Sequence, residues 1–407
     1  MKQIEGGVTA AKGFEATGVA AQIKYKGRND MAIVYSQKPC VAAGTFTTNV
    51  VKAAPVLWDK HLIEDCDYMQ AVIINSGIAN ACTGSEGYGY CKATAEAAAK
   101  ALNISEDSVA VASTGVIGMQ LPIDRIIKGI SLLKEAMGST LADGHDAACA
   151  IMTTDTKPKE IAFEFEVAGT KCIIGGMCKG SGMIHPNMCT MLCFLTTDVN
   201  ISKSLLTKAL KNDVQDTFNM ISVDGDTSTN DTVLLMANGE AGNPEIIEED
   251  EYYDSFCKAL HAVMEGLSKK IAGDGEGCTC LFECQVKHAD TKQNARTLAK
   301  SVITSNLTKA AIFGHDANWG RILCALGYSG VNFDPGKVDI FFESKAGILK
   351  IVENGVSTGY SEEKATEILS QEYVTAVCDM HNGSENATAW GCDLTYEYVK
   401  INGDYRS

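Results

Sequence analysis

The sequence lacks the long apolar runs and the surplus of basic residues that would connect it with membranes or nucleic acid. No run of roughly eighteen uncharged apolar residues, enough for a membrane span, occurs in it. No apolar stretch follows the early Lys2, as it would in a secretion signal. The formal net charge of −16 disfavours broad attraction to nucleic acid or to anionic membranes. We therefore expect a cytoplasmic protein whose partners are small molecules rather than nucleic acid or a membrane.

The sequence also lacks the signatures of several common sites. No Walker or Rossmann glycine loop marks a nucleotide site, and the seven histidines show no triad order or G-x-S-x-G elbow. The acidic run DGDTSTND at 224–231 lacks EF-hand spacing, so we interpret it as a polar turn close to the site. The segment CTCLFEC at 278–284 lacks paired C-x-x-C spacing and has only His288 nearby, which favours a core strand over a metal centre. We therefore expect no metal and no bound cofactor.

The composition is that of a large folded protein. The 407 residues exceed the usual size of a single core, and 45% of them are hydrophobic against 21% charged. The sixteen cysteines are expected to be thiols, because no secretion signal is visible. Strand and helix patterns alternate in the first half, whereas later strands follow one another as in hairpins. This order predicts an α/β fold of mixed, largely antiparallel sheets layered with helices. The length is consistent with two lobes, which we expect, or with one large two-layer unit.

Hydrophobic periodicity places individual elements along the chain. Helices are expected at 94–102, 145–156, 202–218 and 251–273. Strands are expected at 69–77, 108–118, 161–169, 171–178, 190–198, 281–289, 338–344, 347–355 and 388–403. The strand at 190–198 is almost wholly apolar, which predicts that it is buried and puts Thr190 at its first position.

One segment carries the most specific information about function. The residues KGSGMIHPNMCTML at 179–192 resemble the signature of the ornithine acetyltransferase family of arginine biosynthesis, called ArgJ. Further agreement comes from STGVIG at 113–118, MTTDT at 152–156, GDGEG at 273–277, HDANWGRI at 315–322 and the terminal INGDYRS. The resemblance implies a self-cleaving enzyme of the N-terminal-nucleophile type, with a fold like that of the related aminopeptidase DmpA.

The resemblance assigns the cleavage to the Cys189–Thr190 bond. Its glycine-rich loop allows a tight bend, in which the Thr190 hydroxyl would attack the Cys189 carbonyl. An alpha fragment, 1–189, and a beta fragment, 190–407, would result, with the active site between them and two copies of each in the assembly. The freed Thr190 would be nucleophile and, through an α-amine with a pKa of roughly 8, its own base. A threonine at a strand start is common, so this assignment depends on the flanking motif, in which alanine usually takes the place of Cys189.

The remaining site residues also follow from the resemblance. Thr114 and Gly115 are expected to form the oxyanion hole, the hydroxyl and the backbone N–H each donating a hydrogen bond. Lys179 suits a carboxylate and Glu276 an ammonium group. The full set of expected substrate-binding residues is Thr153, Lys179, Thr190, Glu276, Asn402 and Ser407.

Three further positions are assigned supporting roles. We expect His185 to order the cleavage turn rather than to catalyse, because the α-amine already serves as the base. His315 is interpreted as structural. Residues 318–321 receive no definite role beyond structural support near the nucleophile.

The expected reaction transfers an acetyl group from N-acetylornithine to Thr190 and then to glutamate in a ping-pong cycle. Bifunctional members of the family also accept acetyl-CoA as a donor, and no residue decides whether this chain does. Two alternatives remain open. One is a related N-terminal-nucleophile aminopeptidase or amidohydrolase, in which water accepts the acyl group, and the other is an uncleaved binding protein.

Overall fold

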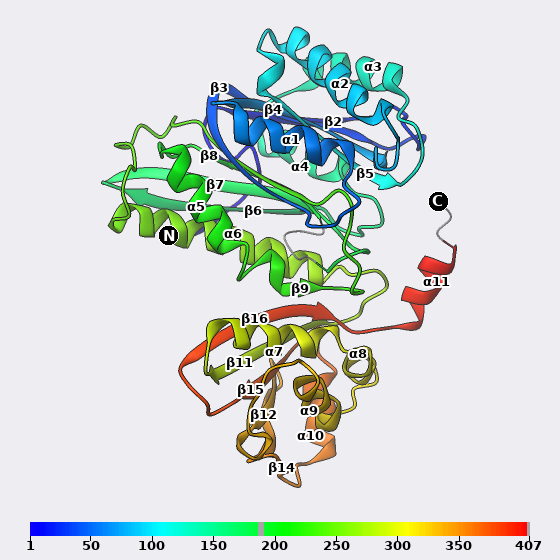
Figure 1. The fold of residues 1–407 in the computed structure, drawn as a ribbon, viewed down its shortest axis with the longest axis vertical. Helices are drawn as coiled ribbons and strands as arrows, with labels where there is room; N and C mark the ends of the chain where they lie inside the picture. The colour runs from blue at the N-terminus through cyan, green and yellow to red at the C-terminus, as the bar shows by residue number, and fades with distance from the viewer. Residues whose placement is uncertain (186–190, 405–407) are drawn as a thin grey trace.

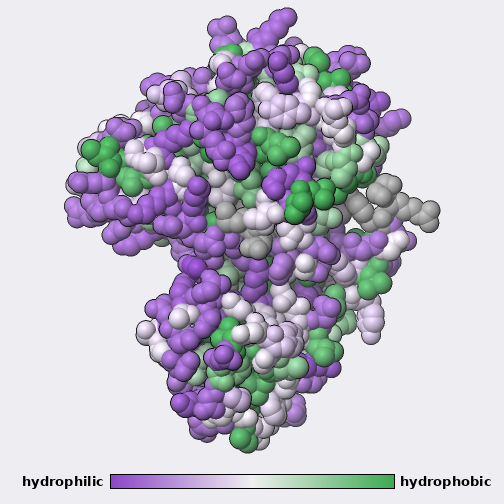
Figure 2. Space-filling model, in the orientation of Figure 1, coloured by the Kyte–Doolittle hydropathy of each residue, from purple (hydrophilic) through white to green (hydrophobic). Residues whose placement is uncertain are grey.

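The computed structural model describes residues 1–185 and 191–404, so the expected cleavage residues Cys189 and Thr190 and the terminal Ser407 lie outside the described residues. The described chain forms two lobes, each built around one sheet (Figure 1). The surface seen in Figure 2 is mostly hydrophilic, with hydrophobic residues scattered across it. No helix in the described part of the chain is both long and apolar enough to span a membrane.

The first sheet has nine described strands. In spatial order they are β1 (Lys2–Ile4), β6 (Lys159–Val167), β7 (Thr170–Lys179), β8 (Leu192–Thr197), β10 (Thr232–Ala237), β3 (Met31–Phe46), β4 (Met69–Ile78) and β5 (Val109–Val116), with β2 (Phe14–Val19) beside β3. β8 runs parallel to β10 and β4 parallel to β5, and the other described pairs are antiparallel. The long β3 pairs with β2 and β4 through its first half and with β10 through its second.

The second sheet has seven described strands. Their order is β14 (Val356–Ser357), β13 (Gly347–Glu353), β12 (Asp339–Ser344), β15 (Tyr373–Asp379), β11 (Leu281–Ala289), β16 (Glu385–Cys392) and β9 (Ile221–Ser222). β11 is parallel to β15 and β16 to β9, whereas the other pairs are antiparallel. The expected α/β fold with mixed, largely antiparallel sheets is confirmed.

Eleven α-helices in the described residues cover these sheets. They are α1 (Ala54–Asp65), α2 (Glu86–Leu102), α3 (Ile123–Ala136), α4 (Leu141–Ala150), α5 (Lys203–Asp213), α6 (Glu251–Ala272), α7 (Lys292–Thr304), α8 (Asn306–Phe313), α9 (Trp319–Gly327), α10 (Glu362–Leu369) and α11 (Tyr396–Asp404). Single 3₁₀ turns lie at Glu106–Ser108, Phe218–Met220 and Pro335–Lys337. In Figure 1, α1 to α4 cover the first lobe at its β3–β5 end, and α7 to α10 belong to the second lobe.

Helix α6 joins the two lobes. Its N-cap is Asp250, whose carboxylate accepts hydrogen bonds from the N–H groups of Tyr252 and Tyr253. Its apolar side chains recur at helical spacing, as in Phe256, Leu260 and Val263 onward. They pack against β6 and β7 of the first sheet and against β9 and β16 of the second. One hydrophobic core therefore extends from the first sheet into the second lobe, and a separate core packs beneath α1 to α4.

Most predicted elements are confirmed in type, but α2 begins eight residues before position 94, α4 ends six residues before position 156, and the last expected strand is wrong beyond Cys392. β16 stops there, and α11 occupies Tyr396–Asp404. The carboxylate of Asp393 accepts hydrogen bonds from the backbone of Thr279 and Cys280, so the chain is held as it leaves the sheet. The residues that follow form a helix, in which Tyr398 donates a hydrogen bond to Asp224 and Asn402 donates one to Glu276.

The cysteine-rich segment 278–284 is a strand only from Leu281 onward, where β11 begins, so the expectation holds for its second half. Cys280 and Cys284 are buried, the latter within β11, and all described cysteines are free thiols. The predicted break at 189–190 falls between β7 and β8, which are antiparallel neighbours paired from Ile174 with Thr197 to Lys179 with Leu192. The two lobes therefore do not divide at that point, because β8 and β10 belong to the first sheet.

Candidate active site

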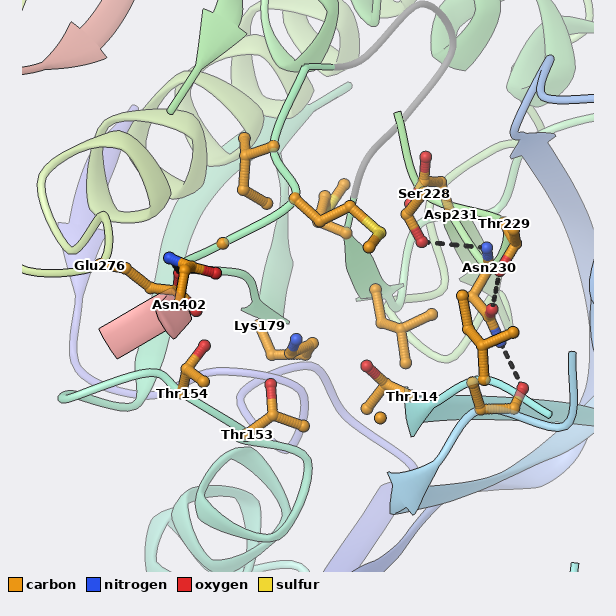
Figure 3. A pocket seen from close by; sticks show the side chains of 18 residues that line it. Thr114, Thr153, Thr154, Lys179, Ser228, Thr229, Asn230, Asp231, Glu276 and Asn402 are labelled. Atoms are coloured by element: carbon orange, nitrogen blue, oxygen red, sulfur yellow. Dashed lines mark hydrogen bonds between the residues drawn. The ribbon is translucent and has the colours of Figure 1, made fainter. Parts of the chain in front are cut away.

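A small polar pocket lies where the ends of several strands meet (Figure 3). It encloses about 170 Å³, less than the roughly 300–1,000 Å³ typical of sites for drug-sized ligands. Six of the residues expected from the sequence line it, namely Thr114, Gly115, Thr153, Lys179, Glu276 and Asn402. They come from β5, the loop after α4, the end of β7, the loop after α6 and α11, so segments far apart in sequence form one site.

Thr114 and Gly115 lie near the end of β5, against the parallel strand β4. Gly115 is opposite Gly77 in the register and has φ of +129°. A Cβ atom at position 115 would lie 2.2 Å from the carbonyl carbon of Gly77. Only glycine therefore fits, because both the backbone angle and the space exclude a side chain. The neighbouring Thr114 side chain faces the pocket in Figure 3.

Lys179 brings a positive charge to the pocket at the end of β7. The residue is 8% exposed, and its Nζ lies 3.9 Å from a carboxylate oxygen of Asp155. Burial lowers the pKa of Lys179, and the Asp155 carboxylate opposes that shift. An ammonium group held in this way at a pocket wall suits an incoming carboxylate.

Asp155 sits at the centre of the charges behind Lys179. Its carboxylate accepts hydrogen bonds from Lys159 at 2.7 Å, from the Gly180 N–H at 2.7 Å and from the Thr153 N–H at 3.0 Å. Burial alone would raise the pKa of Asp155, but Lys179, Lys159 and these hydrogen bonds outweigh burial and hold the pKa at about 2. Asp155 is therefore a buried anion that holds Lys179 and the Thr153 backbone in place.

Lys159 extends this network to the loop that carries Glu276. Its Nζ lies 2.6 Å from Asp274, which also accepts hydrogen bonds from the N–H and hydroxyl of Thr156. The Ser181 hydroxyl donates to the Asp274 carbonyl at 2.7 Å. Sequence reasoning missed Asp155, Lys159 and Asp274. Asp155 and Asp274 do lie inside the quoted MTTDT and GDGEG segments, which was the available signal.

Glu276 brings a carboxylate to the same pocket. It accepts a hydrogen bond from the Asn402 side chain at 2.7 Å. A Cβ atom at Gly182 would lie 2.4 Å from the Glu276 carboxyl group, so glycine at 182 leaves the space for it. The pocket thus presents the cationic Lys179 and the anionic Glu276 and Asp231, and charges of both signs suit an amino acid with free charged groups.

Asp224 connects the loop after β7 with helix α11 through hydrogen bonds at the pocket. Its carboxylate accepts hydrogen bonds from the N–H groups of Met183 at 2.7 Å and Ile184 at 2.8 Å, and from the Tyr398 hydroxyl at 3.3 Å. Burial and the Asp224 charge raise the pKa of Tyr398. The C-terminal helix that carries Asn402 is therefore anchored, as a site residue near a chain end requires.

The acidic run at 224–231 is a polar turn at the pocket, as interpreted from the sequence, and Ser228, Thr229, Asn230 and Asp231 line it. Asn230 is buried and donates hydrogen bonds to the carbonyls of Ala79 at 2.6 Å and Ser113 at 2.8 Å. This amide therefore fixes the turn against the ends of β4 and β5, beside Thr114 (Figure 3).

The two histidines singled out from the sequence do not line the pocket. His185 Nδ1 lies 3.0 Å from the Ser222 hydroxyl, and the Thr227 hydroxyl donates to the His185 carbonyl. Burial and the nearby Lys300 charge lower the pKa of His185 to about 4, which leaves the ring neutral at pH 7. These contacts fit a role in ordering the turn. His315 is exposed, and its Nδ1 lies 3.4 Å from the Ser370 hydroxyl.

Residues 318–321 do not line the pocket either. Trp319 begins α9 in the second lobe, and the Arg321 guanidinium donates to the Leu307 carbonyl on α8. Their contacts therefore support the second lobe, and the expectation that they act near the nucleophile gains no support.

A small pocket with charged side chains of both signs, in a mixed α/β fold, suits a small molecule with charged groups. The chain belongs to the ArgJ family, whose family model matches residues 15–407. It is 53% identical to arginine biosynthesis bifunctional protein ArgJ 1 of Clostridium acetobutylicum, over 98% of this chain and 97% of that one. It is 49% identical to the ArgJ bifunctional protein of Thermotoga neapolitana, over 97% and 99% respectively.

One solved structure adds a comparison in three dimensions. The crystal structure of the arginine biosynthesis bifunctional protein argJ of Bacillus halodurans is 46% identical in sequence, with a TM-score of 0.51. The match covers 53% of this chain and the whole of that chain. The fold described above is therefore shared, over the matched part, with a member of the same family.

Proposed function

We propose that this protein is a glutamate N-acetyltransferase of arginine biosynthesis, which moves an acetyl group from N-acetylornithine to glutamate. The observation that carries the proposal is that Lys179, Glu276, Thr114 and Gly115 line one pocket. A cation and an anion suit the charged ends of an amino-acid substrate, and the Thr-Gly strand end suits an acyl-transfer oxyanion. The names of the relatives, which place them in arginine biosynthesis, support the same assignment.

We infer that the nucleophile is Thr190, released by cleavage of the Cys189–Thr190 bond. Ile184 and Met191 lie before and after residues 186–190, which the structure does not describe, and both line the pocket. This supports a reaction of Thr190 in that pocket. The Bacillus halodurans chain supports the cleavage. The whole of that chain matches only 53% of this one, and the proposed beta fragment, residues 190–407, makes up a similar share of this chain.

The proposed reaction has two halves. The Thr190 hydroxyl attacks the acetyl carbonyl of N-acetylornithine, and its own α-amine takes the hydroxyl proton. The Thr114 hydroxyl and the Gly115 N–H donate hydrogen bonds to the oxyanion that forms. Collapse expels the ornithine α-amine, which takes up the proton and leaves acetyl-Thr190. The amine of glutamate then attacks this ester, and N-acetylglutamate leaves with the Thr190 hydroxyl restored.

The remaining pocket residues bind the substrates in this proposal. Lys179 pairs with the α-carboxylate, and Glu276 pairs with the side-chain ammonium of ornithine. Thr153, Asn402 and Ser407 contribute neutral hydrogen bonds.

The experiment that tests the transferase uses purified protein with N-acetylornithine and glutamate. Formation of N-acetylglutamate, with no net release of acetate, supports transfer. Acetate as the main product would instead identify a hydrolase of the aminopeptidase type. Intact-mass measurement tests the nucleophile separately, since active protein should contain two fragments. Full activity in an unbroken Thr190→Ala variant would exclude Thr190 as the nucleophile.

We also propose acetyl-CoA as a second acetyl donor and an assembly of two alpha and two beta fragments. The word bifunctional in the relatives' names motivates the first proposal. Acetyl-CoA and glutamate, supplied without N-acetylornithine, should yield N-acetylglutamate. No turnover under these conditions would make the enzyme monofunctional. Sedimentation analysis should give twice the mass of the full chain, and a value equal to one chain would contradict the assembly.

A further inference from the structure

A cluster of metal-binding side chains lies in the second lobe, outside the pocket. His288, Asp379 and His381 each offer one ligand atom, and these atoms lie within 4.8 Å of one another. Among residues 1–185 and 191–404 they form the one group of three histidine, cysteine or acidic side chains gathered in this way. Histidine and carboxylate ligands suit zinc and similar divalent cations.

The backbone turns two histidines toward the same carboxylate. His288 lies where the register between β11 and β16 shifts, and it has φ of +53°. His381, just after β15, has φ of +45°. Both values lie in the left-handed region, which is uncommon for residues other than glycine, with asparagine, aspartate and histidine the most frequent of these. Such bulges and left-handed residues re-aim side chains and gather at functional sites.

The distances between the ligand atoms suit one cation. Nδ1 of His381 lies 3.4 Å from Oδ1 of Asp379, and Nδ1 of His288 lies 2.9 Å from Oδ2 of the same carboxylate. Two ligands about 2.1 Å from a tetrahedral zinc are about 3.4 Å apart. Small movements of side chains at the surface would therefore bring all three atoms to bonding distance. The His288 and His381 side chains are 51% and 46% exposed, so water can complete the coordination.

A second carboxylate orients one of these histidines. Asp339, at the start of β12, lies 3.2 Å from Nε2 of His381, on the opposite side of the ring from Asp379. Metal-bound histidines commonly donate their other N–H to a carboxylate, which sets the tautomer and makes the imidazole a better ligand. Lys350 Nζ lies 3.0 Å from Asp339 and balances its charge. Asp379 therefore supplies the negative charge closest to the cation.

We propose that His288, Asp379 and His381 bind one divalent cation of the zinc class, with water as the fourth ligand and Asp339 as the orienting residue. The cation would join the ends of the parallel strands β11 and β15, and it would stabilise the second lobe. The proposal does not depend on the acetyl-transfer reaction, because none of these residues lines the pocket.

The test uses the full-length protein, stripped with a chelator and titrated with Zn²⁺ by calorimetry. The His288→Gln and His381→Gln variants are compared with His315→Gln, which changes another exposed, left-handed histidine of the same lobe. We expect the wild type and His315→Gln to bind one Zn²⁺ per chain. Each of the other two variants should lose at least about tenfold in affinity, and Asp339→Asn about 10- to 100-fold. Binding should weaken in acid, because protons compete for the imidazoles.

Two further readouts distinguish this site from the many thiols. The absorption spectrum with Co²⁺ should show four-coordinate cobalt without a thiolate charge-transfer band. Zn²⁺ should raise the unfolding temperature of the wild type and His315→Gln but not of His288→Gln. The proposal is overturned if the wild type shows no saturable one-to-one binding, if His288→Gln and His381→Gln bind as the wild type does, or if a thiolate band dominates.

Discussion

Replacing Asp155 with asparagine should separate the charge that positions Lys179 from the shape of the pocket. The Asp155 side chain is fully buried and lies 2.7 Å from Lys159 and 3.9 Å from Lys179. Asparagine has the same size and keeps one oxygen that can accept a hydrogen bond, but it removes the negative charge. Two buried ammonium groups would then remain, with Asp274 near only one of them. Stability and substrate binding should both fall.

The size of the stability loss follows from the pKa of Asp155. The folded-state pKa of about 2 lies below the ordinary value of 3.8. The ionised carboxylate therefore stabilises the folded state above about pH 4, and this stabilisation is lost as the pH falls toward 2. The shift corresponds to about 2–3 kcal/mol at neutral pH. Removing one partner from a buried pair typically costs about 3–5 kcal/mol, so we expect Asp155→Asn to lose about 3 kcal/mol.

Urea unfolding at pH 7 measures this loss, and Asp216→Asn is the matched control. Asp216 also faces two cations, Arg296 at 2.8 Å and Lys292 at 3.2 Å, but its side chain is 32% exposed. Water screens such a pair, so the control should lose about 1 kcal/mol or less. Equal losses of unfolding free energy in the two variants would show that burial does not explain the stabilising effect of Asp155.

Kinetics give a second, independent readout for Asp155→Asn. Without the carboxylate, the pKa of Lys179 should fall further, since burial already lowers it. The ammonium group then loses its proton at a lower pH. The KM for N-acetylornithine should rise, and the rise of KM on the alkaline side should begin at a lower pH than in the wild type, with kcat less affected. An unchanged KM profile would refute the assignment of Asp155 as the residue that positions Lys179.

Three other changes, one of them paired with a control variant, have defined outcomes. Gly115→Ala should reduce kcat at least about 100-fold, since one oxyanion donor is worth that much, and should destabilise the fold in urea. Gly118→Ala, also at positive φ but with open space around it, should leave kcat near the wild-type value. Glu276→Gln should raise the KM for N-acetylornithine by roughly 10- to 100-fold, the worth of a charged hydrogen bond, and an unchanged KM would remove Glu276 from the site. The folded-state pKa of His185 is about 4, so protonation between about pH 6.5 and 4 favours the unfolded chain. The wild type should therefore lose stability as the pH falls through this range, and His185→Gln should lose less. Urea midpoints measured across that range test it.

Local patterns in the sequence predicted much of the fold. β4, β6, β7 and α6 follow runs whose periodicity is strong and whose ends are marked by glycine or polar residues. The C-terminal segment misled this reasoning, because TYEYVKI alternates as a strand would. Its conformation depends on contacts that Tyr398 and Asn402 make with Asp224 and Glu276, more than 120 residues away in sequence. No local pattern contains that information.

In the candidate site, too, local motifs could be predicted from the sequence, whereas long-range contacts could not. The segments quoted for the family resemblance contain the six expected residues that line the pocket, although HDANWGRI at 315–322 contributes none. The buried network of Asp155, Lys159 and Asp274 was missed, because buried charges have no periodic signature and Lys159 and Asp274 are 115 residues apart. The His288–Asp379 pair is likewise separated by 91 residues, so no metal motif was visible in the sequence.

The pairing of the strands around position 190 bears on what cleavage would do to the enzyme. β8 and β10, which follow Thr190, lie between β7 and β3, which precede it, and hydrogen-bond to them along six residue pairs on each side. The two proposed fragments therefore share one sheet, and separating them would expose four strand edges, those of β7, β8, β10 and β3. We expect the fragments to co-elute in size-exclusion chromatography without denaturant and to run as two species only in a denaturing gel. Fragments that separate under native conditions would contradict this, because a broken bond between β7 and β8 should free the Thr190 amine without loosening the sheet that surrounds it.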